Sequence, residues 1–152
     1  MSERKKIAFL FDKKIASGID ELISLIDDVY GEAKKKDKNV VFTSTRDLAY
    51  LGFNFYSKTK NSYLFFGMYY HVWSDFGYPI CLTLESKRGL IPTTQIAKFK
   101  EQFSKKFSNS GKFIIHEDVP MILFGVDYLL SDCDKIYSDI EELYLILHLN
   151  NE

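Results

Sequence analysis

The sequence predicts an α+β fold: one domain over residues 1–152, in which three or four helices pack against a mainly antiparallel sheet of about five strands. Apolar residues recur at helical spacing near both ends of the chain, whereas between residues 40 and 85 they alternate with a period of two. The connections between the alternating segments are short, which favours antiparallel neighbours. A chain of 152 residues, 46% of them hydrophobic and 27% charged, buries a core without needing a cofactor.

We expect the first clear helix to run from about Ser17 to Lys36. Acidic residues follow Ser17 in the first turn, where the helix dipole favours negative charge. Apolar residues then recur every three or four positions, at Ile19, Leu22, Ile23, Ile26, Val29, Tyr30 and Ala33. The same phase extends back over residues 7–15, which form either an earlier helix or the same helix kinked near Gly18; a short strand at residues 6–11 is the alternative.

The middle of the chain predicts a meander of strands. Alternation is clearest over residues 51–56, 63–73 and 80–85, and a shorter strand over residues 40–45 precedes them. Residues with turn propensity separate the three longer segments. They should therefore pair as antiparallel neighbours.

The rest of the chain predicts a helix, two strands and a final helix. The helix begins near Pro92 and carries phenylalanines at helical spacing as far as Phe107. Residues 113–115 and 121–128 have the composition of strands, and the last helix begins at residues 132–134. The expected order is one helix, three or four strands, a helix, two strands and a helix.

Three aromatic segments carry an internal glycine, namely Gly52, Gly67 and Gly125. Glycine weakens a strand because it offers no side chain for packing, so it marks a bend or a close approach of chain segments. Either the sheet is bent and aromatic rings from neighbouring strands cover the gaps, or a ligand lies over the glycines.

The segment from residue 42 to residue 78 holds 13 of the 24 aromatic residues. If residues 63–73 form one strand, its second face carries five residues that we take as candidate binding residues: Tyr63, Phe65, Tyr69, His71 and Trp73. A patch of this size must be covered. The N- or C-terminal helices cover it, a protein partner or a second copy of the chain binds it, or a small ligand or nucleobases stack on it.

Charge is segregated along the chain. Residues 92–112 hold five basic groups and one acidic group, whereas residues 113–152 hold one basic and nine acidic groups. We expect the two segments to compensate each other or to form solvated faces. Nucleic acid is the less favoured partner, because the acidic segment repels it and the formal net charge is −1.

The sequence favours a cytoplasmic location. Two cysteines, Cys81 and Cys133, are too few for a disulfide framework. The apolar run at residues 7–11 is shorter than the core of a signal peptide. No stretch is long and apolar enough for a membrane helix, so no membrane association is expected.

Motifs that bind phosphate, dinucleotides or zinc are absent, and we expect neither a cofactor nor a metal site. The segment His116-Glu117-Asp118 is dense in potential ligands. Because neighbours on a strand point to opposite faces, only His116 and Asp118 could share an ion there.

One arrangement of polar residues has a possible catalytic interpretation. Glu85-Ser86-Lys87 ends the third long strand, in a layout of helix, three antiparallel strands, helix and strand. This layout resembles the PD-(D/E)XK nuclease core. The resemblance implies that Glu85 and a second carboxylate hold Mg²⁺ while Lys87 positions the attacking water, since Mg²⁺ prefers hard oxygen ligands. The expected pairing of the hairpin sets Glu85 opposite about Gly67, so Asp47 is the nearest second carboxylate.

We therefore expect a non-catalytic binding or protein-interaction domain that uses its aromatic-rich sheet, with a protein partner or self-association. The alternative is a Mg²⁺-dependent nuclease of the PD-(D/E)XK type, or an inactive relative of that fold, with Glu85, Lys87 and Asp47 as candidate catalytic residues.

Overall fold

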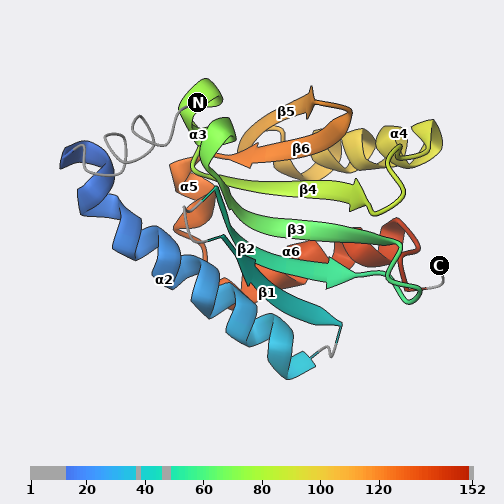
Figure 1. Ribbon diagram of the computed structural model, residues 1–152, viewed down its shortest axis with the longest axis horizontal. Helices are drawn as coiled ribbons and strands as arrows, with labels where there is room; N and C mark the ends of the chain where they lie inside the picture. The colour runs from blue at the N-terminus through green and yellow to red at the C-terminus, as the bar shows by residue number, and fades with distance from the viewer. Residues whose placement is uncertain (1–12, 37–38, 46–48, 151–152) are drawn as a thin grey trace.

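The computed structural model describes residues 13–36, 39–45 and 49–150, which form an α+β fold built on one antiparallel sheet (Figure 1). The sheet has six strands in the order β1-β2-β3-β4-β6-β5. The strands are β1 (Val40–Ser44), β2 (Tyr50–Tyr56), β3 (Ser62–Tyr69), β4 (Ile80–Ser86), β5 (Gly111–His116) and β6 (Val119–Phe124). The predicted fold class and element order are confirmed, with one strand more than the expected five.

The helices in the described part of the chain include two short ones, α3 and α5, that the sequence did not predict. They are α2 (Lys13–Lys36), α3 (Tyr70–Phe76), α4 (Thr93–Gln102), α5 (Val126–Leu129) and α6 (Cys133–Ile146), and a π-helical turn, η1 (Phe103–Phe107), extends α4. The first helix is already formed at Lys13 and continues through Gly18, so Ser17 does not begin it. Residues 7–12, for which a helix or a strand was expected, lie outside the described residues.

Two of the predicted strands were too long. Residues 63–73 were expected as one strand, but β3 ends at Tyr69 and the chain turns directly into α3. Gly77 ends this helix in the left-handed conformation, with φ 81°, and its N–H donates to the carbonyl of Trp73. The expected strand 121–128 likewise ends at Phe124, and Gly125 precedes the short helix α5.

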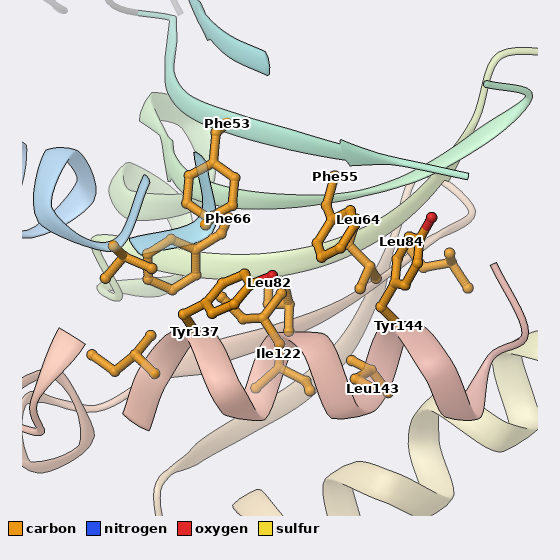
Figure 2. Close-up of a cluster of buried hydrophobic side chains, with 14 of the residues drawn as sticks. Phe53, Phe55, Leu64, Phe66, Leu82, Leu84, Ile122, Tyr137, Leu143 and Tyr144 are labelled. Atoms are coloured by element: carbon orange, nitrogen blue, oxygen red, sulfur yellow. The ribbon is translucent and has the colours of Figure 1, made fainter. Parts of the chain in front are cut away.

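The first face of the sheet forms the main core. Phe53 pairs with Phe66, which pairs with Leu82, so the same face continues across β2, β3 and β4. Helix α6 lies across this face, and its side chains Tyr137, Leu143 and Tyr144 meet the sheet residues (Figure 2). Helix α2 packs against the same cluster. Burial of these large side chains is the main stabilising contribution to the fold.

The second face of the sheet is covered only in part by the described residues. Val72 and Phe76 of α3 pack onto Cys81 of β4 and Leu123 of β6, at the end where β3 bends into the helix (Figure 1). The terminal helices α2 and α6 lie on the opposite face, so the expectation that they cover the second face is wrong for their described residues. We call the part of the second face formed by β1, β2, β3 and the end of β4 the open face.

A pair of glycines produces a close approach of β2 and β3. Gly52 and Gly67 are directly opposite each other in the register. A Cβ on Gly52 would lie 2.3 Å from the carbonyl oxygen of Phe66, and one on Gly67 would lie 2.3 Å from that of Leu51. The ring of Phe65 covers both glycines, since its Cζ lies 2.8 Å and 3.0 Å from these two Cβ positions. Of the two expectations for these glycines, the structure supports an aromatic ring that covers the gap.

Opposite charges of the basic segment 92–112 and the acidic segment 113–152 meet between η1 and α6. Lys106 of η1 forms ion pairs with Asp139, at 2.9 Å, and with Glu142 of α6. Asp139 is only 6% exposed and also accepts hydrogen bonds from Tyr128 and Lys135, at 2.8 and 3.0 Å. Compensation between the basic and acidic segments, expected from the sequence, is therefore present at this network. No helix in residues 13–36, 39–45 and 49–150 has the length and apolar character needed to cross a membrane.

Candidate functional site

The open face contains a small pocket lined by side chains from four adjacent strands. Its volume is about 230 Å³, and its lining consists of Thr43, Tyr50, Asn54, Tyr63, Phe65, Tyr69 and Glu85. Three of these, Tyr63, Phe65 and Tyr69, are candidate binding residues from the sequence. They share one face of β3, as the alternation predicted.

Aromatic rings form the walls of this pocket. The rings of Phe65 and Tyr69 lie 4.5 Å apart between centroids, and Tyr50 meets them at 6.4 and 6.0 Å in edge-on orientations. Phe65 is held in place from below because it lies over the paired glycines Gly52 and Gly67. The close approach of β2 and β3 thus positions the aromatic wall of the pocket.

The Glu85 carboxylate accepts hydrogen bonds from three hydroxyl groups. Its Oε2 accepts from Thr83, at 2.6 Å, and from Tyr69, at 2.7 Å. Its Oε1 accepts a longer bond of 3.5 Å from Tyr63, the residue directly opposite in the register. These bonds fix the direction of the carboxylate within the aromatic surroundings.

The two tyrosines that donate to Glu85 have strongly perturbed acidity. Burial, followed by the negative charge of Glu85, raises the pKa of Tyr69 far above its ordinary value. The same two causes, in the same order, raise the pKa of Tyr63. Because an ionised tyrosine beside a carboxylate would face both desolvation and repulsion, both hydroxyls remain protonated donors.

The charge of Glu85 has no positive partner in the described ranges 13–36, 39–45 and 49–150, where no ion pair includes it. Lys87, two residues further on, is exposed, and its Nζ lies 5.0 Å above the ring of Tyr56. The pocket therefore presents a carboxylate whose negative charge is solvated or is balanced by a bound group.

The same lining contains a second acceptor, and this one has no hydrogen-bond partner among the described residues. Asn54 donates from its Nδ2 to the hydroxyl of Tyr56, at 3.2 Å, but its buried Oδ1 accepts no hydrogen bond from the described residues. A buried polar atom without a partner is uncommon and indicates a missing water or ligand donor. The lining thus contains a second acceptor besides Glu85, the buried Oδ1 of Asn54, which a ligand donor reaches when the amide turns toward the pocket.

The nuclease arrangement is incomplete in the described part of the chain. The pocket lining has one carboxylate, that of Glu85, and Asp47, the expected second carboxylate, lies outside the described residues. The expected register was also wrong: Glu85 faces Tyr63, not Gly67, because the Gly67 position pairs with Cys81.

The last two candidate binding residues do not lie on the strand face. His71 and Trp73 belong to α3, where Trp73 packs against the main core on the first side of the sheet. His71 lies beside the pocket residue Tyr69, with ring centroids 5.6 Å apart, and beside His116 of β5, at 5.4 Å. The expected row of five residues is therefore wrong in its last two members.

Four residues of the site were missed by the sequence analysis: Thr43, Tyr50, Asn54 and Thr83. Three of them could have been found from the strand register, because Thr83 precedes Glu85 by two positions and Tyr50 and Asn54 are opposite Tyr69 and Phe65. The direct pairing of Gly52 with Gly67 would have indicated this register.

A larger hollow, of about 470 Å³, lies at the end of β4 and the start of α4. Its border includes the exposed side chains of Arg88, Leu90 and Thr94, and its lining contains no carboxylate, histidine or cysteine. The pocket at Glu85 is smaller, but its polar groups are oriented by partly buried neighbours. It is therefore the stronger candidate site. No family model, curated protein or solved structure gives a significant match to this chain.

Proposed function

We propose that this protein is a non-catalytic binding domain whose open face receives a cationic side chain, lysine or arginine, from a protein partner. The observation that carries the proposal is the Glu85 carboxylate, oriented by three hydroxyl groups and surrounded by aromatic rings without a basic neighbour in the described residues. A cation in this position gains a charge-assisted hydrogen bond and cation–π contacts together.

The second acceptor supports a ligand with several N–H groups. Asn54 Oδ1 is buried and lacks a donor. An ammonium or guanidinium group has enough donors to serve both Glu85 and Asn54 once the Asn54 amide turns toward the pocket. The tyrosine hydroxyls cannot supply the missing positive charge, since they are neutral donors. The polar groups of the pocket thus complement a cation better than an anion or a neutral aromatic ligand.

The size of the pocket favours a side chain over a free small molecule. Its volume of about 230 Å³ is below the range of roughly 300–1,000 Å³ that is typical of small-molecule sites. Val41 of the edge strand β1, which is opposite Asn54, is 49% exposed and provides an apolar border. Aromatic anchors beside an apolar border are typical of protein interfaces.

The proposed location is the cytoplasm. Both cysteines are free, and Cys81 is fully buried. Burial, followed by the charge of Glu85, raises the pKa of the Cys81 thiol, which keeps it in its less reactive protonated form. An unpaired, inert core thiol fits a reducing compartment.

The proposal is tested by nuclear magnetic resonance titration of the full chain with N-acetyl-arginine amide. The neutral isostere N-acetyl-citrulline amide is the matched control ligand. We expect localised shifts at the pocket residues with a Kd on the order of 1 mM for arginine alone. Glu85→Gln should weaken this binding about tenfold or more, because hydrogen bonds to charged groups contribute about 1.5–3 kcal/mol. Glu101→Gln, an exposed carboxylate on α4, should leave it unchanged.

Equal binding of the citrulline and arginine derivatives, or unchanged binding to Glu85→Gln, would contradict the proposal. The same spectra also test the nuclease alternative through titration with Mg²⁺. A saturable Mg²⁺ site that disappears in Glu85→Ala would favour the nuclease alternative over a cation-binding pocket.

A further inference from the structure

Three potential metal ligands from separate elements meet beside the open face. They are His71 of α3, His116 at the end of β5 and Glu117 in the turn between β5 and β6. One ligand atom from each lies within 4.8 Å of the others, and the two imidazole rings are 5.4 Å apart between centroids. In the described residues this is the one such group of three or more histidine, cysteine or acidic side chains.

The fold brings these residues together through two local features. Helix α3 begins where β3 ends, and it packs back onto β4 and β6 through Val72 and Phe76. This packing carries His71 across the sheet toward the β5–β6 hairpin, so that residues 45 positions apart become neighbours.

The hairpin turn directs the third ligand. Glu117 and Asp118 both have positive φ, at 51° and 66°, as the two central residues of a type I′ turn require. The turn interrupts strand alternation, so Glu117 lies on the side of His116, with Oε1 3.9 Å from its Nε2. The sequence-based pairing of His116 with Asp118 is therefore replaced by a pairing of His116 with Glu117.

The imidazole groups are held by aromatic neighbours. The ring of Tyr69 lies 5.6 Å from that of His71, and the edge of Phe76 meets His116 at 5.5 Å. His116 is 24% exposed at its side chain, whereas Glu117 is 80% exposed. Two partly buried nitrogen ligands and one exposed carboxylate form a site that an ion can reach from solvent.

We propose that His71, His116 and Glu117 bind a first-row divalent transition-metal ion, with Zn²⁺ as the preferred occupant. Imidazole nitrogen with a carboxylate oxygen is a donor set that suits Zn²⁺ and disfavours Mg²⁺ and Ca²⁺. Metal–ligand distances of about 2.0–2.2 Å in a tetrahedron place ligand atoms roughly 3.4 Å apart. Ligand atoms that now lie within 4.8 Å of one another must therefore approach by up to about 1.4 Å on binding. Water completes the coordination.

Metal binding at this position ties α3 to the β5–β6 hairpin. Tyr69 connects the two sites, because its ring lies beside His71 and its hydroxyl donates to Glu85. The ion therefore stabilises the helix that directly follows Tyr69, a residue of the Glu85 pocket. The proposed metal site does not depend on whether the Glu85 pocket binds a cationic ligand.

The experiment is isothermal titration of the metal-free full chain with Zn²⁺, followed by thermal unfolding. We expect one Zn²⁺ per chain and a rise in the unfolding midpoint of roughly 5–10 °C when free Zn²⁺ is 100-fold above Kd. His71→Gln and His116→Gln should each lose the stoichiometric site. Glu117→Gln lies in an exposed turn, so it should fold normally and bind Zn²⁺ at least about tenfold more weakly.

Two matched variants keep the assignment specific. Asp118→Asn removes the other acid of the same turn, and His148→Gln removes the third histidine of the sequence. Both should bind Zn²⁺ like the unmodified chain. Replacement of Zn²⁺ by Co²⁺ should give visible ligand-field bands without a thiolate charge-transfer band, because the ligands are nitrogen and oxygen.

The proposal is overturned by any of three results. The unmodified chain fails to bind Zn²⁺, stoichiometric binding persists in either His71→Gln or His116→Gln, or Co²⁺ gives a thiolate band that disappears in Cys133→Ser. Because no cationic ligand is used, each result is independent of the outcome at Glu85.

Discussion

Replacement of Gly52 by alanine should destabilise the protein strongly, although alanine ordinarily stabilises a strand relative to glycine. The added Cβ would lie 2.3 Å from the carbonyl oxygen of Phe66, 2.8 Å from Cζ of Phe65 and 2.9 Å from Cα of Gly67. Two of these three atoms are backbone, so a side-chain rotation cannot relieve the contact. The strands β2 and β3 must separate locally by roughly 1 Å to reach ordinary van der Waals distances.

The expected cost follows from this geometry. Overpacking of a core by added methyl groups costs about 1–3 kcal/mol, and the contact with two backbone groups places Gly52→Ala at the upper end, about 3 kcal/mol. A gain of about 0.5–1 kcal/mol from the reduced entropy of the unfolded chain offsets part of this. A net loss of about 2 kcal/mol corresponds to a decrease in Tm of roughly 4–8 °C for a chain of this length.

Gly31→Ala is the matched control because nothing lies within 4 Å of its added Cβ and the residue is inside helix α2. It should stabilise the protein by about 0.5–1 kcal/mol. Urea unfolding followed by the fluorescence of Trp73, the single tryptophan, measures both variants. Unchanged or increased stability of Gly52→Ala would refute the argument that the glycine pair permits the close approach of β2 and β3.

Two further predictions concern buried polar groups. Burial opposes ionisation of Asp139, but hydrogen bonds from Lys106, Lys135 and Tyr128 lower its pKa below the ordinary value. Asp139→Asn should therefore cost about 2–3 kcal/mol at pH 7. The difference from the unmodified chain should shrink as the pH falls from about 4, the ordinary pKa of the unfolded chain, through the lower pKa of the folded carboxylate. Equal urea midpoints at pH 7 would contradict this. In the folded chain Tyr69 should stay protonated well above pH 10, the ordinary tyrosine pKa. An alkaline absorbance titration of the folded chain should therefore give the same absorbance change for Tyr69→Phe as for the unmodified chain. A loss of one titrating group in that variant would show that Tyr69 ionises normally.

Local periodicity was enough to predict most of the regular elements. The apolar stripe of α2, the phenylalanine spacing of α4 and the apolar face of α6 each bury one side of a helix, and that requirement is visible in the sequence itself. The alternation in β2 and β4 likewise reflects strands whose alternate side chains contact two different hydrophobic clusters, one on each face of the sheet. These elements are predictable because their apolar residues recur with the same period at which side chains return to the buried side of the helix or strand.

The end of β3 was not predictable in this way. Residues 69–73 are aromatic or apolar at every position except His71, so they fit a strand buried on both faces and a short helix equally well. The choice depends on what the segment packs against. In the structure Val72 meets the second face of β4 and β6 while Trp73 meets the main core, an arrangement that a helix permits and a strand continuing β3 does not.

By itself, the sequence determined the fold class, the helices α2, α4 and α6, and the shared face of Tyr63, Phe65 and Tyr69, since these follow from spacing along one segment. The tertiary structure alone decided that Tyr69 meets Glu85 and that His71 meets His116 and Glu117. Those contacts join segments 16 and 45 residues apart. They depend on the close approach of β2 and β3 at the glycine pair, the packing of α3 and the left-handed turn at Glu117, so no periodicity along the chain encodes them.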